Sequence, residues 1–200
     1  MVVVGKSKTS HSVGKKIAPA VSPQVGDTFL DTPFENIIHH TCDFQNQTEI
    51  LPQALNYHFS AGGSRTRATL CFNLCLALGM TSRQASHMAC VPELLHNASL
   101  IHDDLQDTDE MRRGQESLWK KFGHDVAICA GDYLISAAYK CAAQTETTNL
   151  PALIATIHHH VTDVIKGQID DLRQDKNHAL DDIPTYEQIC AKKSGALLAM

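Results

Sequence analysis

The residues best suited to chemistry form an acidic run between positions 103 and 110, where five of the eight side chains are carboxylates and none is a cation. Asp103 and Asp107 are four residues apart, so on a helix they extend from one face, about 6 Å apart along the axis. The run falls near the predicted C-terminal end of a helix, where the macrodipole is negative and each carboxylate costs roughly 0.3–1 kcal/mol. A divalent cation would offset this repulsion, and proteins commonly hold Mg²⁺ with a few carboxylates and substrate phosphates. Considered alone, the run fits a solvated acidic surface about equally well.

Cationic side chains follow the acidic run within one short loop. Arg112, Arg113 and Gly114 come next, and guanidinium groups match phosphate geometry through paired hydrogen bonds. Carboxylates that bind a metal beside paired arginines predict a site for an anion that arrives with its metal, and a diphosphate fits best. His96 precedes Asp103 by seven residues, which on a helix returns to the same stripe within about 20°. We therefore expect His96 to face the same cavity as Asp103.

The chain from residue 33 onward has the spacing of a helical protein. Glycines fall mainly between segments of helical periodicity, and no segment shows the sustained alternation of a β-strand. Predicted helices cover residues 33–46, 50–60, 64–78, 81–105, 116–122, 125–143, 150–174 and 185–200. The boundary residues are Gly62 and Gly79 after helix ends, and Thr81, Asn149 and Thr185 at helix starts. Pro92 is expected to kink or divide the long fourth helix. We predict an all-α bundle.

Length, charge and cysteine content narrow the class of protein. The chain of 200 residues suffices for one domain, and we expect a flexible tail over residues 1–30 and a helical domain over residues 31–200. A net charge of −5 disfavours nucleic acid and anionic membranes as partners. No apolar run approaches the ~18 residues that cross a bilayer, so no membrane span is expected. The cysteines number seven and form no CxxC pair, which favours reduced thiols and a cytoplasmic location.

Together, the motifs resemble those of the trans-type isoprenyl diphosphate synthases, the polyprenyl synthetase family. Asp103-Asp104-Leu105-Gln106-Asp107, with the trailing Arg112-Arg113-Gly114, resembles the first aspartate-rich motif of that family. The other matches are Gly62-Gly63-Ser64-Arg65-Thr66-Arg67 with GGKRxR, Gly167-Gln168-Ile169-Asp170-Asp171-Leu172 with GQxxDL, and Lys193-Ser194 with KT. The resemblance implies an isoprenoid-synthase-type helical bundle around a central cavity.

The resemblance also implies a reaction, in which an allylic diphosphate ionises, isopentenyl diphosphate attacks the carbocation and a proton is lost. Asp103 and Asp107 would hold Mg²⁺ against the allylic diphosphate. The remaining roles would be Arg112 and Lys193 on that same diphosphate, Gln168 and Asp171 along the cavity that manages cation and proton, and Arg67, His96 and Arg113 on isopentenyl diphosphate. Cations stabilise a leaving diphosphate, and an apolar cavity protects a carbocation from water. The resemblance further implies a homodimer or a synthase partner.

Two departures from the family pattern shape these expectations. Ser64 replaces the lysine of the glycine-rich motif, so we expect weaker binding of isopentenyl diphosphate or a different second substrate, with Arg65 pointing elsewhere. The second aspartate-rich motif, which completes the metal site in the family, is missing from the sequence, so the C-terminal helices are expected to be absent. The chain is then a fragment, which its apolar end favours, or a half-length protein that needs a partner, or a non-catalytic relative.

Small residues upstream of the acidic run bear on product length. Ala98 and Ser99 lie about one helical turn below Asp103 and would leave room for a growing chain, so we expect geranylgeranyl diphosphate or a longer product. Three other functions compete with the synthase. They are a non-catalytic or regulatory subunit of a synthase complex, a terpene cyclase, which also uses DDxxD, and a metal phosphohydrolase built on His102 and Asp103. The arginine pair and the motif that contains Gln168 and Asp171 disfavour a cyclase, and the phosphohydrolase would need an upstream histidine such as His58 at the same metal.

Overall fold

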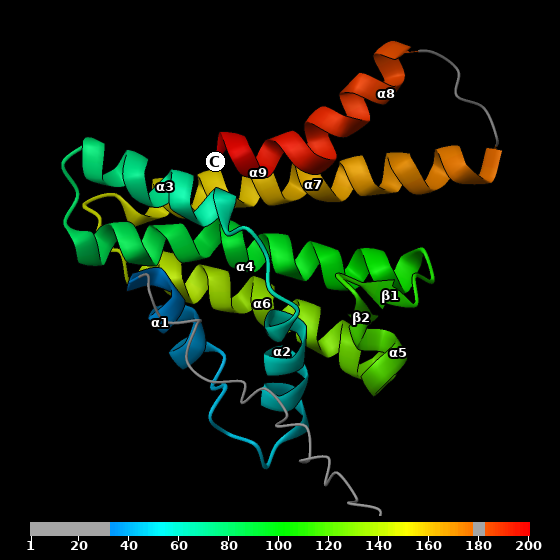
Figure 1. Cartoon of the computed structure of the whole chain (residues 1–200). Helices are drawn as coiled ribbons and strands as arrows, with labels where there is room; N and C mark the ends of the chain where they lie inside the picture. Colours follow the sequence, from blue (N-terminus) through cyan, green and yellow to red (C-terminus); the bar gives the residue numbers. More distant parts are fainter. Residues whose placement is uncertain (1–32, 178–182) are drawn as a thin grey trace, which may run out of the picture.

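The structure is a computed structural model that describes residues 33–177 and 183–200, so the predicted tail over residues 1–30 lies outside the described residues. Four long helices run side by side (Figure 1). They are α3 (Thr66–Ala77), α4 (Ser82–Gln106), α6 (His124–Ala143) and α7 (Leu150–Asn177). The shorter elements are α1 (Pro33–Thr41), α2 (Ile50–Ser60), β1 (Met111–Arg112), β2 (Gln115–Glu116), α5 (Leu118–Phe122), α8 (Ile183–Cys190), the π-helical turn η1 (Ala191–Gly195) and α9 (Ala196–Ala199). The predicted all-α class is confirmed, with a minimal hairpin added.

Helix α4 is the central element and contacts α1, α3, α5, α6 and α9. It begins at a capping box, in which the Gln84 N–H donates to Thr81 Oγ1 at 3.3 Å and the Thr81 N–H donates to Gln84 Oε1 at 3.0 Å. Thr81 is therefore confirmed as the cap. Pro92 does not divide the helix, contrary to one of the two outcomes expected for it. Val91 and Leu94 are fully buried on either side, so packing holds the helical path where proline removes a hydrogen bond.

Glycines end two helices as predicted. Gly79 has a φ of +86°, and the Met80 N–H behind it donates to Cys75 O at 3.0 Å, which closes α3 with a Schellman motif. Gly62, with a φ of +78°, follows the end of α2. Both positions favour glycine because a side chain is strained in the left-handed region.

One of the other two predicted helix starts is confirmed and one is wrong. Asn149 Oδ1 accepts the Ala152 N–H at 3.2 Å, as an N-cap does. Thr185 is not a cap, because α8 already begins at Ile183. The helix can start there since Pro184 is tolerated in a first helical turn, where its missing N–H needs no partner.

A short antiparallel hairpin corrects the expectation that no strands form. Met111 pairs with Glu116 across it, and the turn residues Arg113 and Gly114 have φ values of 52° and 84°. Positive φ at both central positions is typical of the tight turns that join hairpin strands. Strands of two residues are too short to show an alternating pattern. The predicted helix over residues 116–122 consequently begins only at Leu118.

The C-terminal segment is also less regular than predicted. In place of one helix over residues 185–200, the chain forms α8, the π-turn η1 and α9. The turn lies directly on α7, where a Cβ on Gly167 would approach the Lys193 backbone nitrogen to 2.6 Å. The close approach therefore requires glycine at position 167, and it presents the lysines of η1 to α7.

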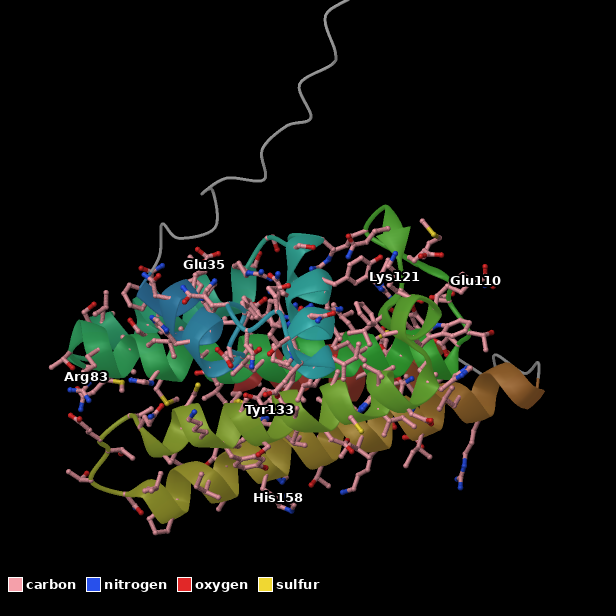
Figure 2. All side chains as sticks on the ribbon, turned by 90° about the horizontal axis from the view of Figure 1, so that it is seen from below. Glu35, Arg83, Glu110, Lys121, Tyr133 and His158 are labelled. Carbon is pink, nitrogen blue, oxygen red and sulfur yellow. The ribbon has the colours of Figure 1, made fainter. Side chains whose placement is uncertain are left out.

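Helix α6 is the one described helix that is long and apolar enough to cross a membrane. It packs along α4 and buries Ala130, Leu134 and Ala138. Figure 2 shows Arg83 at one end of the bundle and Glu110 with Lys121 at the opposite end. The acidic end of α4 thus lies beside the hairpin.

Candidate active site

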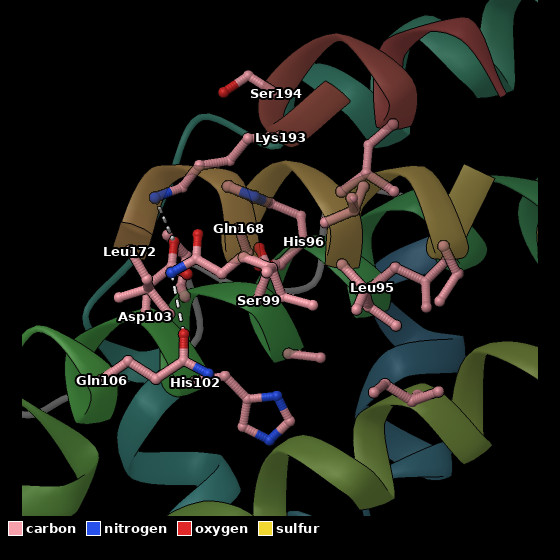
Figure 3. Close-up of a pocket in the computed structure, with 18 of the residues that line it drawn as sticks. Leu95, His96, Ser99, His102, Asp103, Gln106, Gln168, Leu172, Lys193 and Ser194 are labelled. Atoms are coloured by element: carbon pink, nitrogen blue, oxygen red, sulfur yellow. Dashed lines mark hydrogen bonds and ion pairs between the residues drawn. The ribbon is translucent and has the colours of Figure 1, made fainter. Parts of the chain in front are cut away.

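A cavity of about 250 Å³ lies between α4, α7 and the η1–α9 segment (Figure 3). Its lining comprises Arg67 from α3, Leu95, His96, Ala98, Ser99, Leu100, His102, Asp103 and Gln106 from α4, Ile135 from α6, Val161, Val164, Ile165, Gln168, Ile169 and Leu172 from α7, and Lys193, Ser194 and Leu197 from the C-terminal segment. Charged and amide groups gather at one end, and aliphatic side chains line the rest. The cavity can hold a ligand with a charged head and an apolar tail.

Most of the residues that the sequence singled out meet in this cavity. Those that line it are Arg67, His96, Ala98, Ser99, Asp103, Gln168 and Lys193. The helical stripe predicted from the spacing of His96 and Asp103 is therefore confirmed. Asp171, Asp107, Arg112 and Arg113 are not part of the lining, although Asp171 accepts a hydrogen bond from Lys193, which is.

Lys193 is the hub of the polar end. Its Nζ donates to Asp171 Oδ2 at 2.6 Å. The same Nζ lies 3.8 Å from Asp103 Oδ2 (Figure 3). Burial opposes the lysine charge most strongly, but the hydrogen bond with Asp171 and the charges of Asp103 and Asp171 outweigh it and raise the pKa of Lys193. The ammonium therefore stays charged near neutral pH, as a ligand for an anion must.

Gln168 adds a dipole beside this hub. Its Nε2 donates to Gln106 Oε1 at 2.9 Å, which links α7 to the end of α4. The Gln168 Oε1 atom is buried and has no hydrogen-bond partner among the described residues. A buried carbonyl oxygen without a partner costs free energy unless a ligand or water satisfies it. The amide is thus set to face a bound molecule.

Arg67 and His96 form a second polar corner of the cavity. Arg67 Nε is buried without a hydrogen-bond partner in the part of the chain that the structure describes. Burial, followed by the charges of Arg67 and Arg113, lowers the pKa of His96 to about 4. His96 is therefore neutral at pH 7, and its ring N–H can donate a hydrogen bond to an anion without adding charge.

Arg112 lies outside the cavity and pairs with Asp104. Its Nε is 2.8 Å from Asp104 Oδ1, its Nη2 contacts the same oxygen, and Nη2 lies 3.9 Å from Asp109. The Asp104 side chain is 1 % exposed, and burial raises its pKa despite the guanidinium. Asp104, the second aspartate of the run, was not among the predicted site residues. The available signal was that Asp104 directly follows Asp103. On a helix the next side chain points about 100° away, so the two aspartates face different sides.

Arg113 is tied to the glycine-rich turn. Its Nη1 donates to Gly62 O, and a Cβ on Gly63 would approach that nitrogen to 2.7 Å. Burial and then the charge of Arg65 lower the pKa of Arg113. The hairpin therefore packs directly on the turn that precedes α3, and the absence of a side chain at Gly63 makes room for it.

The carboxylates of Asp103 and Asp107 fit the hard oxygen chemistry of Mg²⁺. They are one helical turn apart, since the Asp107 N–H donates to Asp103 O at 2.8 Å. Burial raises the pKa of Asp103, and the charges of Asp107 and Asp104 raise it further against the pull of Lys193. No group of three potential metal ligands gathers among the described residues. Two carboxylates with waters and phosphate oxygens are a common Mg²⁺ shell, so the residues fit the ion.

His102 shows how tightly α4 meets α6. Its Nε2 lies 3.7 Å from Asp132 Oδ1, and a Cβ on Gly131 would collide with the ring. Sequence reasoning assigned His102 only to the competing phosphohydrolase. His58, the second ligand which that function needs, instead lies 3.1 Å from Asn97 and is 4 % exposed. His58 therefore does not supply the second metal ligand that a phosphohydrolase would need.

The apolar part of the cavity lies below Asp103 along α4. Ala98 is 2 % exposed, and Ser99 donates its hydroxyl hydrogen to His96 O at 2.8 Å. Both side chains are small, and the serine hydroxyl is already satisfied within its helix. The cavity walls there are otherwise aliphatic, as a hydrocarbon tail requires.

The fold and site define an isoprenoid-synthase-type bundle. A family model, Polyprenyl synthetase, matches residues 48–200, and the chain belongs to that family. The structure resembles geranylgeranyl pyrophosphate synthetase from Pyrococcus horikoshii, with a TM-score of 0.75 and 31% identity over 82% of this chain and 50% of that one.

Two curated relatives are similar to this chain in sequence. Geranylgeranyl diphosphate synthase from Cyanophora paradoxa is 40% identical over 154 residues, which are 72% of this chain and 51% of the relative. Dimethylallyltranstransferase from Fischerella ambigua is 36% identical over 159 residues, which are 75% of this chain and 45% of the relative. The chain thus spans about half the length of the curated relatives it matches.

Proposed function

We propose that this chain carries a trans-prenyltransferase site, which condenses an allylic diphosphate with isopentenyl diphosphate. The observation that carries the proposal is the polarity of the cavity. Lys193 and Asp103 are 3.8 Å apart at its charged end, and the small side chains of Ala98 and Ser99 lie on the same helix below them. The family membership and the names of the relatives support this reading.

The charged end would bind and release the allylic diphosphate. Asp103 and Asp107 would hold Mg²⁺, which when bound would neutralise charge on the leaving diphosphate. Lys193 would donate hydrogen bonds to the same group as its C–O bond breaks. Gln168 would direct the buried oxygen of its amide at the electron-poor carbon. The aliphatic walls would keep water from the cation.

The corner formed by Arg67 and His96 would bind isopentenyl diphosphate. Arg67 supplies a fixed charge and His96 a neutral donor, while Ser64 supplies no cation in place of the family's lysine. We therefore propose weaker binding of this substrate than in relatives that carry the lysine. A product of geranylgeranyl length or longer fits the open apolar end.

The condensation assay tests the proposal directly. Purified chain is incubated with Mg²⁺, isopentenyl diphosphate and farnesyl diphosphate, and the products are identified by mass spectrometry after dephosphorylation. We expect a prenyl diphosphate longer than the primer, and a loss on the order of 100-fold with Asp103→Asn. Asp163→Asn on the outer side of α7 is the matched control, since its carboxylate pairs with exposed His159. Turnover only after addition of a full-length relative would favour the partner-dependent subunit, and no turnover in either case would overturn the proposal.

We also propose that the chain assembles as a homodimer or with a synthase partner, in a reducing compartment such as the cytoplasm. All seven cysteines are free thiols, which supports the second point. Ile128 on α6 is 47% exposed beside exposed Cys129, and we propose that a partner contacts these two side chains. Light scattering of the purified chain, with and without a full-length relative, tests the assembly.

A further inference from the structure

A buried polar network lies beneath the glycine-rich turn that joins α2 to α3. Glu93 on α4 is 2% exposed and Asn97, one turn later, is completely buried. Glu93 Oε1 accepts hydrogen bonds from Arg65 Nη1 and from Asn97 Nδ2, each at 3.0 Å. His58 on α2 extends the network, with its Nε2 3.1 Å from Asn97 Oδ1. The network therefore links α2 and the start of α3 to α4 through Glu93 and Asn97.

Arg65 is committed to this network and does not enter the cavity. It is the residue before α3 and has a left-handed φ of 51°, and its side chain is 10% exposed. Its guanidinium also lies 3.8 Å from Glu35 on α1. Arg65 thus cannot take the place of the lysine that Ser64 replaces, and the expectation that it points elsewhere is confirmed.

The network is adjacent in sequence to both side chains of the second polar corner, Arg67 and His96. Arg67, whose buried Nε has no hydrogen-bond partner among the described residues, follows Arg65 by two positions. His96 follows Glu93 by three positions and lines the same cavity. Any shift of the turn would move Arg67 relative to His96. A displacement of about 1 Å can cost an enzyme on the order of 100-fold.

We propose that Glu93 and Arg65 are a positioning pair for the isopentenyl diphosphate site, holding the glycine-rich turn so that Arg67 and His96 converge on one diphosphate. Arg65 itself does not bind the anion. The inference rests on the proposed function, since it explains how the second substrate's corner is kept in place without the family's lysine. Loss of the Glu93 charge leaves the Arg65 cation buried without its main partner, so the turn must move to expose it.

A double-mutant cycle tests the pair. Binding of isopentenyl diphosphate is measured by calorimetry for Glu93→Gln, Arg65→Gln and the double variant, beside the KM for each substrate. We expect each single variant to weaken isopentenyl diphosphate by about 10- to 100-fold, the double variant to be no weaker than either single one, and the KM for the allylic diphosphate to stay unchanged. Arg83→Gln, which breaks an exposed ion pair with Glu146, is the matched control.

Other results would overturn the inference. If Arg65 binds the diphosphate directly, Glu93→Gln frees its guanidinium and tightens isopentenyl diphosphate. If Glu93 serves stability alone, its variant melts earlier but binds isopentenyl diphosphate as wild type does. If Glu93→Gln does not fold, Glu35→Gln is the substitute, because it removes the weaker ion pair of Arg65. We then expect a smaller loss of affinity for isopentenyl diphosphate. Unchanged affinity would count against the pair.

Failure of the proposed function is separable from failure of this inference. A wild-type chain that binds isopentenyl diphosphate but condenses nothing refutes the proposed function, and the dissociation constants of the variants then decide the role of Glu93. A wild-type chain that condenses both substrates, with variants of unchanged affinity, refutes only the positioning pair.

Discussion

Arg112 and Asp104 are joined across the turn that follows α4, with the arginine Nε 2.8 Å from the aspartate Oδ1. The pair separates the roles of neighbouring aspartates. Asp103 faces the cavity, whereas Asp104 faces the hairpin and holds its first strand against the end of the helix. The motif thus combines a ligand position with a structural anchor.

Replacing the anchor should cost stability. Asp104→Asn removes the charge that faces the Arg112 guanidinium, and we expect the free energy of unfolding to fall by about 1.5–3 kcal/mol, the usual contribution of a hydrogen bond to a charged group. Urea unfolding followed by circular dichroism measures it. Glu146→Gln breaks a pair whose side chains are 71% and 61% exposed, and should change stability by less than about 1 kcal/mol. Equal midpoints for both variants would show that the buried pair is not an anchor.

The contact between α7 and η1 predicts an effect on activity from a single methyl group. Gly167→Ala places a Cβ 2.6 Å from the Lys193 backbone nitrogen, so the π-turn must move and carry Lys193 with it. We expect condensation to fall on the order of 100-fold with helical content retained. Gly195→Ala is the control, because its Cβ meets nothing closer than 3.9 Å, and alanine suits a helical backbone better than glycine. Full activity of Gly167→Ala would show that condensation does not depend on the exact position of Lys193.

Product length should respond to bulk below Asp103. Ala98→Phe with Ser99→Phe narrows the apolar end, so we expect products of farnesyl length or shorter, measured by chromatography of the dephosphorylated alcohols. Because Ala98 is buried, the double change can overpack the core by about 1–3 kcal/mol, and Ser99→Phe alone is the milder variant. Ala155→Phe, on the exposed side of α7, controls for added bulk. An unchanged product distribution would contradict the placement of the growing chain along α4.

Two neutral histidines predict how stability depends on pH. Burial lowers the pKa of His58 from its ordinary 6.5 to about 4, and burial with nearby arginines does the same for His96. In the unfolded chain both take up protons below about pH 6.5, whereas in the folded chain they resist until about pH 4, so stability falls across that window as pH falls. Urea midpoints at several pH values between 7 and 4 check this. His58→Gln should flatten the dependence, and an equally steep decline in that variant would exclude His58 as a cause.

The sequence predicted those features that local signals determine. Thr81 and Gly79 mark helix boundaries through capping and left-handed backbone, which need only a few neighbouring residues. The common stripe of His96 and Asp103 follows from helical periodicity alone. Lys193 could be placed beside them only through the family resemblance.

The remainder depends on contacts between distant segments. Each strand of the hairpin has two residues, which is too short for a periodic signal. In its turn, Arg113 has a positive φ, and its side chain donates a hydrogen bond to Gly62 O. The π-turn depends on how closely η1 approaches Gly167 on α7. Arg112 was expected on a diphosphate, and its contact with Asp104 depends on the path of the hairpin, which no helix pattern encodes.

Ala98 and Ser99 lie on α4, the helix that also carries Asp103. Along this helix, each residue lies about 1.5 Å further from the Asp103 carboxylate. Under the proposed function, a larger side chain at position 98 or 99 would shorten the product while Asp103 stays unchanged, so that product length and cleavage of the C–O bond would be adjustable separately.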